Sequence, residues 1–169
     1  MKKTLFFILI FLGINICYGQ ELKHRTVDIE LGLGITFGAV KFPDYEGGIG
    51  PCLKLEGRYN FKEFSVDVGL QIAQCPIIRD HPFTSNETDV NRVSSILLLG
   101  DYQFRKGKRI NTYAGLGVGP VWSEDSNSTY ACIVPRIGVK CFNHLNLYLD
   151  YKYATRADRH ASLCLGFYF

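Results

Sequence analysis

Beyond residue 19, the chain lacks any long apolar run. No stretch there approaches the roughly 20 consecutive apolar residues that a transmembrane helix needs, so any membrane span must be made of strands. A strong excess of one charge is also missing, because 17 basic and 16 acidic residues remain after residue 19. This near balance gives no reason to expect a nucleic-acid partner.

Closely spaced cysteines are absent as well. Five cysteines lie beyond residue 19, and no two of them form a C-x-x-C motif. An odd and widely spaced set is neither a metal-binding signature nor a complete disulfide framework. We therefore expect no metal and no cofactor.

The first residues have the pattern of a secretory signal peptide. Lys2 and Lys3 precede an unbroken apolar run over residues 5–13, and small residues up to Gly19 stand at the usual cleavage offsets. The apolar run is too short for a stable membrane span. We predict a signal peptide over residues 1–19 and a mature chain of residues 20–169 that starts at Gln20.

The last ten residues alternate between two faces of an extended strand. One face is apolar and carries Ala161, Leu163, Leu165, Phe167 and Phe169. The other face is less apolar and carries His160, Ser162, Cys164, Gly166 and Tyr168. Seven earlier stretches alternate in the same way, at residues 27–38, 52–61, 64–73, 95–104, 112–120, 133–141 and 145–153. Each has about the 9–11 residues that a tilted strand needs to cross a bilayer.

The connections between these stretches alternate in length. Short turns are predicted at residues 62–63, 105–109 and 143–144, and longer loops at 41–50, 74–91 and 123–129. Pro135 is unfavourable within a predicted strand, since proline usually marks a sheet edge or a bulge. An even strand count with alternating short turns and long loops predicts an all-β, eight-stranded, antiparallel up-and-down transmembrane barrel.

The second face of the strands carries the charges. If the apolar face were the interior, as in a soluble barrel, some forty large side chains would have to fit inside eight strands, which cannot enclose them. The polar face therefore points inward, and its acids and bases are expected to form a salt-bridged plug. The predicted interior network consists of Asp28, Glu30, Lys54, Glu56, Arg58, Asp67, Asp101, Arg136, Lys140, Asp150 and Lys152.

The terminal pattern of Leu163, Leu165, Phe167 and Phe169 resembles the C-terminal signal that the barrel-assembly machinery reads in bacterial outer-membrane barrels. The mature chain as a whole resembles the small OmpA/OmpX-type barrels, including the porin-family barrels common in Bacteroidota. The resemblance implies a monomer in the outer membrane of a Gram-negative bacterium. It also implies contact with outer-membrane lipid and lipopolysaccharide, and with the assembly machinery during biogenesis.

Three functions stay open at this point. The first is a structural or surface-interaction role, with a ligand bound by the extracellular loops, because binding is often placed on loops of a rigid scaffold. The second is a porin-like channel for small solutes, since inward glycines leave some room beside the charges.

Cys52 and Cys75, near the same end of adjacent strands, are expected either as a disulfide or as free thiols.

The third is a lipid-modifying hydrolase. His160 and Ser162 have an H-x-S spacing that resembles the outer-membrane lipid A deacylases. Those enzymes continue with Asn, where this chain has Leu163, and they supply an acid further along, where residues 164–169 hold no carboxylate. A catalytic base needs an orienting group, so we expect no enzyme activity.

Overall fold

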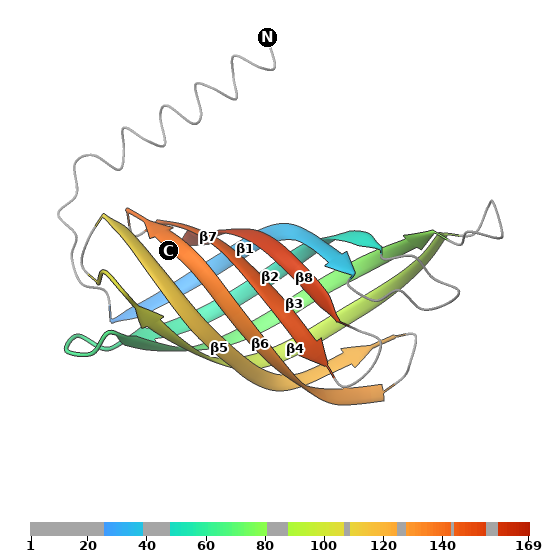
Figure 1. The fold of residues 1–169 in the computed structure, drawn as a ribbon, viewed down its shortest axis with the longest axis horizontal. Helices are drawn as coiled ribbons and strands as arrows, with labels where there is room; N and C mark the ends of the chain where they lie inside the picture. Colours follow the sequence, from blue (N-terminus) through green and yellow to red (C-terminus); the bar gives the residue numbers. More distant parts are fainter. Residues whose placement is uncertain are drawn as a thin grey trace, which may run out of the picture.

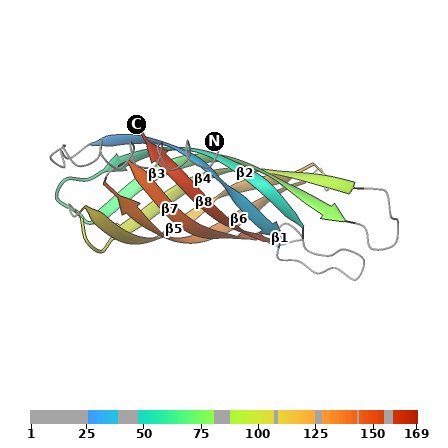
Figure 2. The ribbon, with the colours of Figure 1, turned by 90° about the horizontal axis from the view of Figure 1, so that it is seen from above.

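The computed structural model describes residues 26–38, 48–80, 88–106, 109–124, 128–142, 144–154 and 159–169. Every strand is antiparallel to its neighbours, and β1 pairs with β8 to close a barrel (Figures 1 and 2). The predicted eight-stranded antiparallel barrel is confirmed. Its strands are β1 (Val27–Gly38), β2 (Ile49–Asn60), β3 (Val66–Asp80), β4 (Thr88–Gln103), β5 (Ile110–Ser123), β6 (Ser128–Cys141), β7 (Leu145–Ala154) and β8 (His160–Tyr168).

Two further expectations concern segments outside the barrel wall. The predicted signal peptide, residues 1–19, lies outside the described residues. Within the described ranges, no helix has the length and apolar character needed to cross a membrane.

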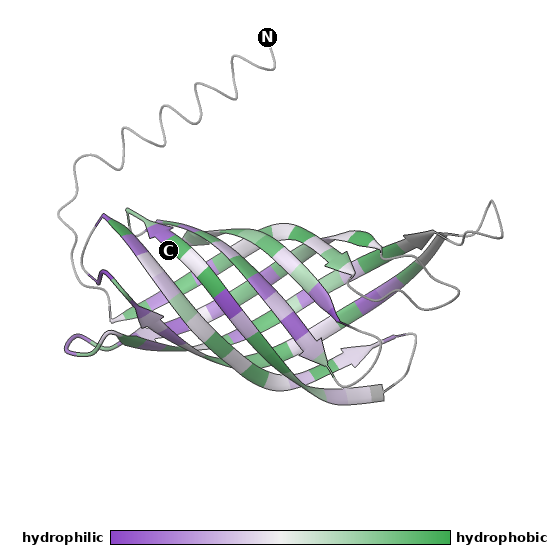
Figure 3. Ribbon diagram, in the orientation of Figure 1, coloured by the Kyte–Doolittle hydropathy of each residue, from purple (hydrophilic) through white to green (hydrophobic). Residues whose placement is uncertain are grey.

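The strand faces separate apolar from polar side chains as the period of two predicts. Along β2, exposed and buried residues alternate without interruption from Ile49 to Asn60. Among the described residues of the barrel, thirty-five large apolar side chains are more than a third exposed, and hydrophobic and hydrophilic residues alternate along the strands (Figure 3). Soluble monomers rarely expose apolar patches larger than a few hundred Å². Exposed apolar side chains on every strand instead fit a lipid environment.

The strands are longer than predicted at one end of the barrel. The prediction of an irregular segment over residues 74–91 is wrong for residues 74–80 and 88–91, because β3 and β4 stay paired from Gln74 opposite Ser94 to Asp80 opposite Thr88, while residues 81–87 lie outside the described part. Likewise, β2 already begins at Ile49, within the predicted loop 41–50, of which residues 41–47 lie outside the described part. The predicted loop 123–129 shrinks too, since β5 ends at Ser123 and β6 begins at Ser128.

The strand prolines explain why these segments remain strands. Pro76 is paired with β4 and Pro135 with β5, but on the opposite side of each proline the ladder is interrupted. Pro120 behaves in the same way between β6 and β4. A proline lacks the N–H group that would bond to one neighbouring strand, so it interrupts the ladder with that strand and leaves the ladder with the other strand intact. In each case the same register resumes beyond the interruption.

The barrel has two distinct ends. We call the end that carries the β1–β2, β3–β4, β5–β6 and β7–β8 connections the loop end, and the end where β1 begins and β8 finishes the terminal end. At the loop end, β3 and β4 extend past their neighbours as a two-stranded hairpin (Figures 1 and 2). This hairpin is the most prominent strand feature at the loop end.

Candidate functional site

The centre of the barrel interior is a cluster of ion pairs around Arg136. This guanidinium comes from β6 and contacts Glu56 of β2, with 2.8 Å between Nη1 and Oε2. It also donates from Nε to Oδ1 of Asp101 on β4 at 2.7 Å, with a second contact from Nη2. Because β2, β4 and β6 are not neighbours in the sheet, Arg136 joins three separate parts of the wall across the interior.

A second arginine extends this cluster toward β1. Arg58 donates from Nε to Oε1 of Glu56 at 2.9 Å, and its Nη2 lies 3.3 Å from Asp101 and 3.7 Å from Glu30. The carboxylate of Glu30 also accepts a hydrogen bond from Asn146 at 3.0 Å. Glu56 and Asp101 therefore each contact the guanidinium groups of both Arg58 and Arg136, an arrangement that compensates buried charge.

Aromatic rings and one further ion pair continue the packing at the terminal end. The Tyr113 ring centroid lies 5.6 Å from the Arg58 guanidinium and 5.7 Å from that of Arg136. Lys140 donates to Asp67 at 3.1 Å. Asp28, at the rim, is only half-buried and accepts a hydrogen bond from Asn60 at 2.6 Å.

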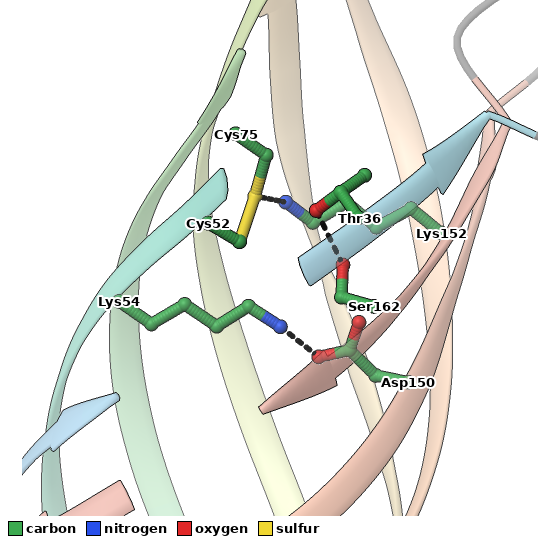
Figure 4. Close-up of a disulfide and its surroundings, with 7 residues drawn as sticks. All are labelled: Thr36, Cys52, Lys54, Cys75, Asp150, Lys152 and Ser162. Atoms are coloured by element: carbon green, nitrogen blue, oxygen red, sulfur yellow. Dashed lines mark hydrogen bonds and ion pairs between the residues drawn. A yellow bond between two sulfur atoms is a disulfide. The ribbon is translucent and has the colours of Figure 1, made fainter. Parts of the chain in front are cut away.

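A smaller charged group lies nearer the loop end. Lys54 and Asp150 form a direct ion pair, and Lys152 points its ammonium group at the sulfur of Cys75, 3.9 Å away (Figure 4). Among the described residues, no carboxylate is paired with Lys152. The structure thus buries ten of the eleven predicted network residues and places nine of them in ion pairs, with Asp28 and Lys152 outside these pairs.

The buried charges balance. Among the described residues, five acidic and five basic side chains are less than a tenth exposed, so these buried charges leave no net charge to attract ions of one sign. The sequence did not reveal which partners would meet, nor that Tyr113, Tyr148 and Tyr168 would fill the space between them.

Beside buried polar residues such as Ser95 and Ser123, the interior toward the loop end holds a cluster of apolar side chains. These side chains come from β3 to β7 and pack together without contact to solvent. The weaker polarity of residues 97 and 99 on the inner face of β4 was the signal for this cluster in the sequence. The cluster adds apolar side chains to the interior beside the ion pairs, and side chains of eight strands can fill such a barrel. Its members are Ile77, Val93, Leu97, Leu99, Val121, Cys132, Val134 and Ala154.

The two cysteines for which the sequence left two states open are joined. Cys52 of β2 and Cys75 of β3 form a disulfide inside the barrel, and it closes a sequence separation of 23 residues (Figure 4). Cys132, Cys141 and Cys164 are free thiols. The disulfide lies beside the place where the β2–β3 ladder is interrupted, so it holds these strands together covalently.

The residues with deacylase-like spacing do not form an open site. His160 and Ser162 are both fully buried, and the Ser162 hydroxyl is hydrogen-bonded to Thr36 at 3.1 Å (Figure 4). A serine in this position is shielded from a lipid outside the wall. In the part of the chain that the structure describes, no cluster of three or more His, Cys, Asp or Glu side chains could hold a metal ion.

The fold is similar to that of solved outer-membrane barrels. Neisserial surface protein A matches with a TM-score of 0.65 and 13% identity, over 85% of this chain and 96% of that one. OprG from Pseudomonas aeruginosa matches with a TM-score of 0.57 and 14% identity, over 86% and 96%. Ail of Yersinia pestis, the attachment invasion locus protein, matches with a TM-score of 0.54 and 17% identity, over 86% and 100%. No protein-family model and no curated protein sequence matches the chain.

Proposed function

We propose that this chain is exported through a signal peptide at residues 1–19 and that residues 20–169 form a monomeric barrel in the outer membrane of a Gram-negative bacterium. The loop end then faces outward and the terminal end faces the periplasm, as is usual for barrels with short periplasmic turns. The apolar outer wall and the likeness in fold to outer-membrane barrels support this location. Outer-membrane lipid and lipopolysaccharide would surround the wall.

The work of the protein, in this proposal, is interaction at the cell surface. A filled and charge-balanced interior argues against transport, and the fully buried His160 and Ser162 argue against lipid hydrolysis. The names of two structurally similar proteins point the same way, since one is a surface protein and the other an attachment protein. Ail has also been crystallised with the heparin analogue sucrose octasulfate.

The projecting β3–β4 hairpin is the observation that carries this proposal. Its outward side carries polar Gln74, Ser94 and Arg92 directly above the apolar band. Beyond this polar layer, Ile78 and Val90 face each other across the two strands and are 42% and 44% exposed. Ile78 is also paired with Ile49 of β2, which is 58% exposed. An exposed apolar group at the end of the projecting strands is placed to contact a partner outside the membrane.

Adhesion of whole cells tests the surface role. Cells that express the protein are applied to immobilised heparin and to extracellular-matrix proteins, with an unboiled gel to confirm folding. We expect binding to at least one of these surfaces, reduced to the level of non-expressing cells by the double substitution Ile78→Ser and Val90→Ser. The matched control, Arg92→Ser with Glu124→Ser, changes the same end of the barrel and should keep the binding. Adhesion that survives loss of the apolar pair, or no adhesion at all, would refute the proposal.

A further inference from the structure

The terminal end carries a pocket on the outside of the wall. It is open, has a volume of about 690 Å³, and lies between the β4–β5 turn and the β2–β3 turn. Three of its six lining residues are cationic, two are apolar and one is a serine. The lining residues are Ser65, Phe104, Arg105, Lys106, Arg109 and Ile110.

The apolar part of the pocket continues the outward apolar face of the wall. Phe104 and Ile110 are 61% and 55% exposed and lie at the ends of the outward rows of β4 and β5. The Phe104 ring packs edge-on against Tyr102, with centroids 5.4 Å apart. The turn between β2 and β3 has a similar ring pair, Tyr59 and Phe61, at 4.9 Å. Such aromatic belts mark the level of the lipid headgroups.

The cationic part of the pocket lies directly beyond this belt. Lys106 is held in place, because its ammonium group donates to the carbonyl oxygens of Phe61 and Phe64 and lies 3.9 Å from the Asp67 carboxylate. Arg105 and Arg109 are exposed at the two ends of the turn. Within the described ranges, neither arginine is paired with a carboxylate. Two guanidinium groups without a carboxylate partner among the described residues thus lie beside an apolar surface.

We infer that this pocket binds an anionic glycerophospholipid of the periplasmic leaflet, an inference that rests on the membrane location proposed above. Arg105 and Arg109 would hold the phosphate, since guanidinium groups match phosphate oxygens with paired charge-assisted hydrogen bonds. The acyl chains would lie along Phe104 and Ile110. A zwitterionic lipid fits less well, because its ammonium group would meet three cations and one carboxylate.

Lipid titration monitored by native mass spectrometry tests this site. The refolded barrel, released from lipid nanodiscs, is compared for retention of phosphatidylglycerol and phosphatidylethanolamine. We expect a preference for phosphatidylglycerol that falls about tenfold or more in the variant Arg105→Gln with Arg109→Gln. A control with the same loss of charge at the loop end, Arg92→Gln with Arg159→Gln, should keep it. Phe104→Ser should weaken retention of both lipids.

The outcomes separate this inference from the proposed function. A barrel that inserts but binds both lipids equally, or whose preference survives the double arginine substitution, would overturn the lipid site alone. Inorganic phosphate at the concentration of the lipid should not displace phosphatidylglycerol, and complete displacement would point to a soluble phosphate ligand and overturn the inference. Failure of the protein to insert into a bilayer at all would instead overturn the proposed membrane barrel.

Discussion

Arg136→Met is expected to lower the free energy of unfolding by roughly 3–5 kcal/mol, the cost of leaving buried charges without their partner. In the native barrel this guanidinium contacts both Glu56 and Asp101, and all three side chains are shielded from solvent. Methionine fills similar space without the charge. The measurement is urea unfolding of the refolded protein in lipid vesicles, with the folded fraction read from an unboiled gel.

Two comparisons show whether the buried charge is the cause. Arg92→Met removes an arginine whose partner, Glu124, is 3.5 Å away and more than half exposed like Arg92 itself, so a loss of only about 0–1 kcal/mol is expected. Adding Asp101→Asn to Arg136→Met should recover part of the lost stability, because one uncompensated carboxylate disappears. An Arg136→Met barrel as stable as the parent would contradict the ion-paired interior.

Gly119→Ala is the second substitution with a large expected effect. Gly119 lies beside Pro120, where the ladder between β4 and β5 is interrupted. A Cβ atom there would overlap the backbone carbonyl oxygen of Ile96, which cannot rotate away as a side chain can. Because one strand would have to shift, we expect a loss of about 1–3 kcal/mol in the same urea titration.

Gly100→Ala is the matched control for this substitution. Gly100 lies on β4 and faces outward, and a Cβ atom there would meet no other atom within 4 Å. The stability of this variant should stay within about 0.5 kcal/mol of the parent. If Gly119→Ala were equally harmless, the close approach of the strands beside Pro120 would be disproved.

The sequence predicted the barrel because a strand in lipid has a simple pattern. Alternation from Val27 to Gly38 gave β1 with its observed bounds, and the apolar positions from Leu163 to Phe169 do face outward. The polar face was also assigned correctly, because charged residues such as Glu56 and Arg136 are buried inside the barrel. These features depend on local period alone.

Two features could not be predicted because they depend on the closed wall. Pro76 lies in the segment predicted as a loop, but in a barrel each strand has two neighbours, and the ladder to β4 continues where the ladder to β2 is interrupted. The partners inside the barrel are set by the stagger around all eight strands, so nothing in the local pattern indicates that Arg136 meets Glu56, 80 residues away.

A closed interior is the central claim, and single-channel conductance in a planar bilayer tests it most directly. The refolded protein is added at low concentration, and an unboiled gel of the same sample shows that it is folded. The ion pairs around Arg136 and the apolar cluster that includes Leu97 and Val121 predict no steady openings. Steady, ion-selective openings from folded protein would contradict a filled interior and make a porin-like channel the leading function.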